Sequence, residues 1–272
     1  MKAVLKYPGS KWGIAEWIIS QFPKHHSYLE PFFGSGAVLF NKPRSNIETV
    51  NDLDGNVVNL FKCIQQNPEK LARKIYFTPY ARDIYEKAFH ECPDEPFEKA
   101  LNFYIRCNMG HGFRTNGEKV GWKNDVQGRE KAYAATDWCK LPEKIIQAAE
   151  RLRGVQIENR PAIEVIQRFN YKNVLIYCDP PYMLHTRHGK QYKCEMADNE
   201  HKDLLSTLLK HKGPVIVSGY DTDLYNEMLE GWTKMETVSY SQVCTKKKEI
   251  IWMNYKPYAQ QITIDEFINQ RK

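Results

Sequence analysis

Apolar and polar residues follow each other along both ends of the chain in patterns typical of helices and strands. Apolar residues recur at helical spacing over residues 13–22, which predicts a helix that ends before Pro23. Short apolar runs predict strands at 27–31, 47–52, 155–159, 174–178 and 214–220. Helical patterns between them cover 32–42, 55–66, 161–169 and 199–211. Because strands alternate with helices, we predict an α/β fold with a doubly wound, mostly parallel sheet.

This alternation stops in the middle of the chain. Residues 63–140 carry helical and loop patterns rich in aromatic residues and glycine. The alternation resumes with a helical pattern over 141–154, which has a proline near its start and a glycine at its end. Two further segments, 234–240 and 249–255, predict a terminal hairpin. We therefore expect one domain made of residues 1–62 and 150–272, with an inserted subdomain of helices and a hairpin at residues 63–149.

The composition is that of an ordinary globular protein. The chain has 272 residues, of which 42% are hydrophobic and 26% charged. No apolar run approaches the length of a membrane span, and the N-terminus lacks the apolar core of a signal peptide. We therefore expect no membrane partner.

The cysteines and histidines argue against a disulfide framework and against a metal site. The seven cysteines form an odd number and include no Cys-x-x-Cys pair, which favours reduced thiols in the cytoplasm. His25 and His26 have no partners at the spacing of metal ligands. We therefore expect no metal.

Positive charge is concentrated near the middle of the chain. Residues 99–153 hold eleven Lys and Arg against six Asp and Glu, a net of +5 within a formal total of +6. This concentration predicts contact with a polyanionic partner. The alternative is a basic surface that faces only water.

A glycine turn lies between the first predicted strand of the sheet and the next helix. In a doubly wound sheet, glycines such as Gly34 and Gly36 at this point let a ligand approach the backbone. Asp52 stands 18 residues after Gly34, where an acid suits ribose hydroxyls. Leu39 replaces the third glycine of a dinucleotide motif. The pattern therefore predicts a nucleoside-containing cofactor rather than a dinucleotide.

The segment "VLIYCDPPYML" ends a buried strand with two prolines. Pro180 and Pro181 fix their own φ angles, and the first of them restricts Asp179 to extended geometry. The segment then presents one carboxylate, one oriented carbonyl and the ring of Tyr182. A stiff loop without further purpose is the alternative for this motif alone.

The order of these motifs along the chain resembles one known family. "KYPGSK", "EPFFGSG", an acid at the end of the second strand, an insert and "DPPY" follow one another between Lys6 and Tyr255. This set resembles the Dam-type adenine-specific DNA methyltransferases, which use S-adenosylmethionine. The resemblance implies a Rossmann-like methyltransferase fold with an inserted DNA-recognition subdomain.

The resemblance also implies a set of cofactor-binding residues. In that family the early loop and the glycine turn contact the cofactor, and the acid after the second strand holds its ribose. In the family an aspartate usually contacts the adenine of the cofactor. Here Asn159 stands at that place, and its amide could still make the contact. The implied residues are Tyr7, Lys11, Glu30, Pro31, Phe32, Gly34, Gly36, Asp52, Asn159 and Asp179.

The chemistry of adenine explains why the Asp-Pro-Pro-Tyr motif suits this reaction. The lone pair of the exocyclic amine is delocalised into the ring, so the amine is a poor nucleophile. The Asp179 carboxylate and the Pro180 carbonyl can each accept one of its hydrogens and so localise the lone pair. Tyr182 can stack on the base once it is flipped out of the duplex. We predict that Asp179, Pro180, Pro181 and Tyr182 are catalytic.

The insert resembles the family's target-recognition hairpin, in the segment "RCNMGHGFRTNGEKVGWKND". Phosphate contacts from such residues would position duplex DNA, and a few side chains would read base edges. The predicted DNA-binding residues are Asn108, Arg114, Asn116, Trp122, Lys123 and, in a later loop, Arg187. The stretch 118–126 differs from the pattern of GATC-specific members, so the recognition sequence is not carried over. Partnership with a restriction enzyme, a phage function and a solitary regulatory role all fit.

Three alternative functions are compatible with parts of the pattern. The same motif serves RNA adenine methyltransferases in related families. A catalytically inert DNA-binding protein of the same fold would also keep the basic insert, although the intact Asp-Pro-Pro-Tyr motif argues against it. A nicotinamide oxidoreductase fits least, because the third glycine is missing.

Overall fold

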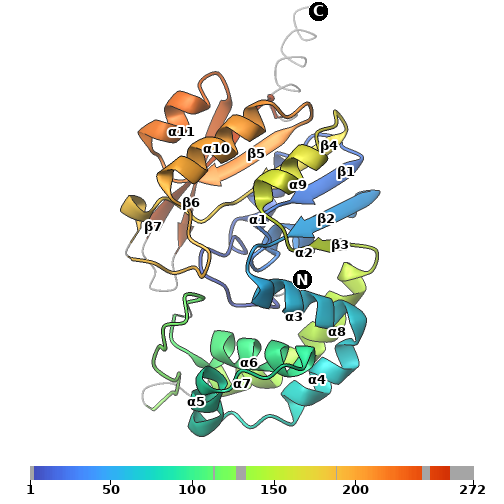
Figure 1. Cartoon of the computed structure of the whole chain (residues 1–272), viewed down its shortest axis with the longest axis vertical. Coiled ribbons are helices and arrows are strands. Elements are labelled where there is room, and N and C mark those ends of the chain that lie inside the picture. The colour runs from blue at the N-terminus through green and yellow to red at the C-terminus, as the bar shows by residue number, and fades with distance from the viewer. Residues whose placement is uncertain (1–2, 113, 127–132, 188, 241–245, 258–272) are drawn as a thin grey trace, which may run out of the picture.

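The computed structural model describes residues 3–112, 114–126, 133–187, 189–240 and 246–257. Within these residues seven strands form one sheet in the order β3-β2-β1-β4-β5-β7-β6 (Figure 1). The strands are β1 (Ser27–Glu30), β2 (Ile47–Asn51), β3 (Gln156–Glu158), β4 (Val174–Cys178), β5 (Val215–Gly219), β6 (Thr233–Tyr240) and β7 (Lys246–Met253). The first five are parallel, and β7 runs antiparallel to both β5 and β6. The prediction of an α/β fold with a mostly parallel sheet is confirmed.

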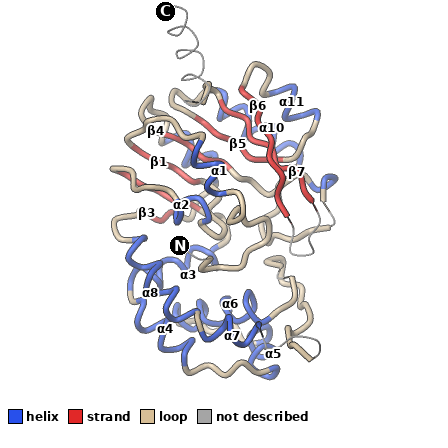
Figure 2. Tube along the Cα trace, turned by 180° about the vertical axis from the view of Figure 1, so that it is seen from behind, coloured by secondary structure: helices blue, strands red, loops and turns tan. Residues whose placement is uncertain are grey.

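Helices cover both faces of the sheet, which explains why its central strands are apolar throughout. Residues on one face of β4, such as Leu175 and Tyr177, share a buried cluster with helices α1, α2 and α3. Those on the other face, such as Ile176, share a second cluster with α9, α10 and α11. Figure 1 shows α9 and α10 in front of the sheet, and Figure 2, from behind, shows α1 and α2 in front of it. These helices are α1 (Ala15–Ser20), α2 (Ala37–Asn41), α3 (Gly55–Gln66), α9 (Ala162–Arg168), α10 (Asp198–Leu209) and α11 (Asp223–Met228).

The middle of the chain forms a group of helices at one side of the sheet, below it in Figure 1. They are α4 (Pro68–Tyr76), α5 (Arg82–His90), α6 (Pro96–Met109), α7 (Tyr133–Cys139) and α8 (Leu141–Leu152). After α6 the chain makes a short antiparallel pairing between Gly110 and Trp122. The division at residues 62 and 150 stays a prediction, because one continuous buried cluster contains residues of both parts, such as Val57 and Tyr104.

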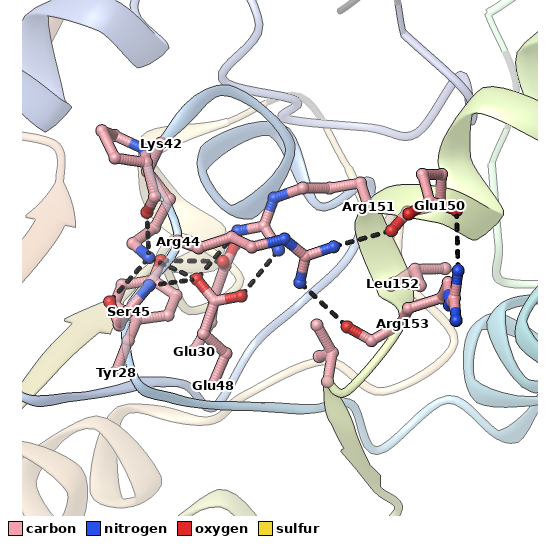
Figure 3. A network of polar contacts seen from close by, with 12 residues as sticks. Tyr28, Glu30, Lys42, Arg44, Ser45, Glu48, Glu150, Arg151, Leu152 and Arg153 are labelled. Carbon is pink, nitrogen blue, oxygen red and sulfur yellow. Dashed lines mark hydrogen bonds and ion pairs between the residues drawn. The ribbon is translucent and has the colours of Figure 1, made fainter.

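A buried polar network attaches the last helix of the insert to the sheet (Figure 3). Glu48 of β2 accepts two hydrogen bonds from the guanidinium of Arg151 in α8, at 2.6 and 2.8 Å. The same carboxylate accepts a hydrogen bond from Lys42 at 2.5 Å. Arg44 donates to the backbone carbonyls of Glu150 and Arg153 at the end of α8, at 2.6 and 2.8 Å. These bonds satisfy carbonyls that a helix C-terminus leaves without partners.

Candidate active site

A cleft of about 1110 Å³ opens at the carboxyl ends of β1 and β4. These two strands are neighbours in the sheet although they are far apart in the chain, and such a switch point is where doubly wound sheets bind ligands. The cleft is lined by the early loop, the glycine turn, the end of β2, the Asp-Pro-Pro-Tyr motif and part of the insert. Of the residues predicted from the sequence, it is lined by Tyr7, Lys11, Glu30, Phe32, Gly34, Asp52, Asn108, Arg114, Lys123, Asp179, Pro180, Pro181, Tyr182 and Arg187.

Lys11 lies at the centre of a buried group of charges. Its ammonium is 3.1 Å from Asp179 Oδ1 and 3.9 Å from Glu249 Oε2, and it donates a hydrogen bond to the carbonyl of Gly9 at 2.8 Å. Burial alone would lower the pKa of Lys11, but the two carboxylates outweigh it and raise that pKa above its ordinary value. Lys11 therefore stays charged, and it contacts the Asp-Pro-Pro-Tyr motif directly.

The surroundings of Asp179 act on its charge in opposite directions. Burial raises the pKa of its carboxyl above the ordinary value, attraction to Lys11 lowers it, and the charge of Glu249 raises it again. The contact with Lys11 engages Oδ1. Oδ1 accepts no hydrogen bond from any described residue, so the carboxylate keeps acceptor capacity for a substrate amine.

Tyr182 is fixed by two contacts. Its hydroxyl donates to Glu249 Oε2 at 2.8 Å, and its ring forms a T-shaped contact with the ring of Tyr220, with centroids 4.5 Å apart. Lys11 Nζ lies 4.5 Å from the centre of the Tyr182 ring. Glu249, the acceptor of the Tyr182 hydrogen bond, is buried on β7 and was missed by sequence reasoning.

The glycine turn holds the carboxylate of Asp52 at the floor of the cleft. The amide of Gly34 donates to Asp52 Oδ2 at 2.8 Å, and the amide of Asp54 donates to Oδ1 at 2.9 Å. A Cβ atom on Gly34 would come within 3.1 Å of the Tyr7 ring, so glycine allows that ring to lie over the turn. Burial raises the pKa of Asp52 to about 6, against these two hydrogen bonds. The group thus offers a buried acceptor to a ligand.

Gly36 and Pro31 are not among the residues that line the cleft, and they stabilise the turn next to it. Gly36 has φ of 68°, and a Cβ there would lie 2.6 Å from the ring of Phe33. Its glycine is therefore required by packing. The carbonyl of Pro31 accepts a hydrogen bond from Asn51 at 2.9 Å. Both residues hold the turn that carries Gly34.

Asp54 was missed by sequence reasoning. Its Oδ1 accepts the amide of Asn56 at 2.9 Å and caps α3. Its Oδ2 is buried and accepts no hydrogen bond from any described residue. A buried acceptor without a donor is costly, so this oxygen beside Asp52 fits a ligand that carries hydroxyl or amino hydrogens.

Asn159 lies at the surface and makes hydrogen bonds to the backbone of the loop that contains Asp52. Its side-chain amide donates to the carbonyls of Asp52 and Leu53, at 2.7 and 3.2 Å, and the residue is exposed. The described residues that line the cleft do not include it. A contact between Asn159 and a cofactor adenine stays a prediction.

The predicted DNA-binding residues of the insert fall into two groups. Asn108, Arg114 and Lys123 line the cleft, and Arg114 is half-exposed in an ion pair with Glu118. Trp122 packs inside the insert, with Tyr80 at 5.7 Å and the guanidinium of Arg82 at 4.9 Å over its ring.

Asn116 joins the insert to the loop that follows Tyr182. Its side-chain amide donates to the carbonyl of Lys190 at 3.1 Å. The backbone amide of Thr115 donates to the carbonyl of Gln191 at 2.8 Å, and the Thr115 hydroxyl accepts from the amide of Lys193 at 2.8 Å. The predicted recognition segment is therefore hydrogen-bonded to the loop that follows the Asp-Pro-Pro-Tyr motif.

Arg187 is bound inside this same loop. Its guanidinium forms a bidentate ion pair with the carboxylate of Glu195, and one of the two contacts is 3.0 Å long. Its Nε donates a hydrogen bond to the backbone carbonyl of Tyr182 at 2.7 Å. The side chain is only 8% exposed. Its contact with DNA phosphate stays a prediction, while the structure shows it holding the Asp-Pro-Pro-Tyr motif.

Glu30 predicts a pH dependence of stability. Burial raises its pKa from 4.5 to about 8, against a hydrogen bond from the Tyr28 hydroxyl at 2.8 Å. Between these values the unfolded chain releases the proton and the folded chain keeps it, so stability falls as pH rises, by up to about 1.4 kcal/mol per unit. Glu30→Gln should remove this slope. Urea unfolding at pH 5 to 8 checks it, and parallel profiles of both proteins would contradict the assignment.

The described residues contain neither a cluster of metal ligands nor a helix that could span a membrane. No group of three His, Cys, Asp or Glu side chains there is arranged to hold a metal ion. No helix in that part of the chain is long and apolar enough to cross a membrane.

Known proteins are similar to this chain over most of its length. A family model described as D12 class N6 adenine-specific DNA methyltransferase matches residues 7–243. The DNA adenine methylase of Salmonella typhi is 24% identical over 240 residues, which cover 83% of each chain. The DNA adenine methylase of Escherichia coli K12 is 24% identical, over 83% of each chain. That of Haemophilus influenzae is 25% identical, over 84% of this chain and 82% of its own. The predicted family is confirmed: the chain belongs to the D12 class N6 adenine-specific DNA methyltransferases.

Proposed function

We propose that this protein transfers a methyl group from S-adenosylmethionine to the exocyclic amine of adenine in double-stranded DNA, at a specific sequence and after base flipping. The observation that carries this proposal is the position of Asp179. Its carboxylate ends β4 at the switch point of the sheet, is followed by Pro180 and faces the same cleft as Asp52. Family membership supports the same chemistry.

The residues of the cleft fit S-adenosylmethionine. Asp52 and the unpartnered Oδ2 of Asp54 offer acceptors for ribose hydroxyls. Tyr7, Phe32, Gly34 and Glu30 line the same cleft. When bound, the cofactor supplies an electrophilic methyl group on a sulfonium.

The protein's part in the reaction is to hold and activate the amine. The Asp179 carboxylate and the Pro180 carbonyl each accept one hydrogen, which localises the nitrogen lone pair. Lys11 favours the ionised form of Asp179 through its 3.1 Å contact with Oδ1, which lowers the pKa of that carboxyl against the effect of burial. The amine loses one proton as its bond to carbon forms, and the carboxylate of Asp179 lies at hand to receive it. Because that proton becomes acidic only at this stage, Asp179 need not be a strong base.

Extrusion of the adenine follows from the depth of the motif. Asp179 is only 18% exposed, so the amine of a base stacked in a duplex cannot reach it. The ring of Tyr182 lines the same cleft and offers a face for the extruded base. Arg114 and Lys123, from the basic insert, lie on the side from which the duplex would approach.

Asp52→Ala is expected to weaken binding of S-adenosylmethionine by about 1.5–3 kcal/mol, because an acceptor of ribose hydroxyls is lost. The amides of Gly34 and Asp54 would lose their partner as well, so the variant must first be shown to be folded. Titration calorimetry on wild type and variant measures the difference. Equal affinities in a folded variant would remove Asp52 from the cofactor site.

Arg114→Ala is expected to weaken DNA binding and to leave cofactor binding unchanged. If Arg114 contacts a phosphate, the slope of log K against log salt should shrink by about one unit. If it reads a base, the slope should hold and the preferred sequence should relax. Fluorescence anisotropy over a salt series separates these results. Glu118→Ala is a matched control, since it frees Arg114 from its ion pair. An unchanged affinity and slope in Arg114→Ala would contradict the assignment.

The alternative that deserves a direct test is methylation of RNA adenine. Labelled S-adenosylmethionine is offered together with duplex DNA and with RNA of matching mixed sequence. We expect label in the DNA alone.

The six free cysteines among the described residues accord with the cytoplasmic setting that we propose.

A further inference from the structure

Glu249 is a buried carboxylate that no motif of the chain announces. It lies on β7 opposite Thr237 of β6, 67 residues after Tyr182 in sequence. Its side chain is 10% exposed and lines the cleft. Burying a carboxylate is costly unless partners compensate, so its contacts should explain why it is there.

The first contact fixes an aromatic ring. The Tyr182 hydroxyl donates to Glu249 Oε2 at 2.8 Å, a hydrogen bond to a charged acceptor. At its other end, the backbone carbonyl of Tyr182 is held by Arg187 at 2.7 Å. The residue is therefore restrained at both its main chain and the tip of its side chain. Such restraint sets the plane of the ring before any base arrives.

The second contact shares one ammonium between two carboxylates. Lys11 Nζ lies 3.1 Å from Asp179 and 3.9 Å from Glu249, so Glu249 competes for the charge that neutralises Asp179. Glu249 thus draws Lys11 towards the Tyr182 ring, where its ammonium lies 4.5 Å from the ring centre. Removing the charge of Glu249 would leave Lys11 to Asp179 alone.

We propose that Glu249 is a positioning residue for methyl transfer: it fixes the Tyr182 ring for the extruded adenine and holds Lys11 between the two carboxylates. This inference rests on the proposed function. Glu249 itself need not touch the substrate, because it acts through Tyr182 and Lys11. Its charge also raises the pKa of Asp179, after the larger effects of burial and of Lys11.

Two variants separate the two contacts. Glu249→Ala removes the acceptor of the Tyr182 hydroxyl, so capture of the flipped base should weaken by about 10- to 100-fold. Glu249→Gln keeps an acceptor of the same shape but removes the charge. Its half-saturating DNA concentration should stay within about threefold of wild type. Glu236→Gln is the matched control, because this exposed glutamate of β6 pairs with Lys248 outside the group.

The modified position in DNA is first mapped with wild-type protein. Fluorescence of 2-aminopurine, placed at that position of a duplex, then measures capture of the flipped base. We expect Glu249→Ala to lower the signal as Tyr182→Phe does, and the double variant to be no weaker than the weaker single one, since both remove the same hydrogen bond. Additive losses, or a Glu249→Ala signal equal to that of wild type, would overturn the inference.

The charge is tested by the pH profile of single-turnover methylation. Because Glu249 raises the pKa of Asp179, Glu249→Gln should move the acid limb of the profile to lower pH. Asp179 also interacts electrostatically with other titratable side chains, and the substitution replaces none of them. They are Lys11, Glu30, Tyr177, Cys178, Tyr182, Tyr192 and Tyr225. A limb that stays in place, or a Glu249→Gln variant that does not fold, would overturn a positioning role.

Failure of this inference is distinguishable from failure of the proposed function. Wild-type protein that neither methylates DNA nor raises the 2-aminopurine signal would overturn both. Wild-type protein that does so, with both Glu249 variants behaving like Glu236→Gln, would overturn only the role of Glu249.

Discussion

Asp179→Ala is expected to abolish methyl transfer while leaving most binding of S-adenosylmethionine and of duplex DNA. The carboxylate accepts a hydrogen from the substrate amine, and removal of such a group costs about 10²–10⁴-fold in rate. In the proposed function, cofactor binding depends on other acceptors of the cleft, such as Asp52. The variant also leaves Lys11 with Glu249 as its remaining carboxylate partner among the described residues.

Single-turnover methylation of matched and mismatched duplexes measures this effect. Tyr182→Ala serves as the comparison, because it should mainly impair capture of the flipped base. A target adenine opposite a mismatch is easier to extrude, so a mismatch should partly rescue Tyr182→Ala and not Asp179→Ala. Near-normal methylation by a folded Asp179→Ala protein would show that the Asp-Pro-Pro-Tyr motif is only a stiff loop.

Arg187→Ala is expected to lower the free energy of unfolding by about 3–5 kcal/mol, since it leaves the carboxylate of Glu195 buried without its charge partner. Glu195 is 14% exposed, and its other partners are the backbone amides of Gln191 and Tyr192, at 2.7 and 2.9 Å. The same substitution removes the donor to the Tyr182 carbonyl at 2.7 Å. Methylation should therefore fall even where the variant is folded.

Urea unfolding of the two arginine variants provides a matched comparison. Arg114 is also paired with a glutamate, but that pair is exposed, so Arg114→Ala should change stability by no more than about 0.5 kcal/mol. If Arg187→Ala kept full stability and lost salt-dependent DNA affinity instead, Arg187 would be a phosphate contact and not a support of the motif.

Local patterns were enough to predict the sheet. Strands β1, β2, β4 and β5 are short apolar runs between polar turns, and parallel strands buried on both faces read in this way. The individual helices of the insert were harder to separate. Short loops join α4, α5 and α6, and aromatic residues occur on faces that pack between helices, such as Tyr85 and Tyr104. The terminal helix of this series, α8, was predicted because proline and glycine mark its ends.

The candidate site was predictable where its residues follow strand ends. Asp52 and Asp179 come directly after parallel strands, and Gly34 lies in the turn that follows β1, so all three lie where the carboxyl ends of these strands meet at one edge of the sheet. Glu249, Asp54 and the Arg187–Glu195 pair were not predictable in the same way. Their roles depend on partners that only the folded chain brings near, such as Tyr182 for Glu249. Arg187 reads as a surface charge in sequence because its burial comes from the loop that closes over it.

The most direct test of the central claim is the identity of the methylated nucleoside. Duplex DNA of mixed sequence is incubated with the protein and S-adenosylmethionine that carries a trideuterated methyl group, then digested and examined by mass spectrometry. We predict trideuterated N6-methyladenine with wild-type protein and none with Asp179→Ala. A labelled cytosine, or no label with folded wild-type protein, would contradict the account.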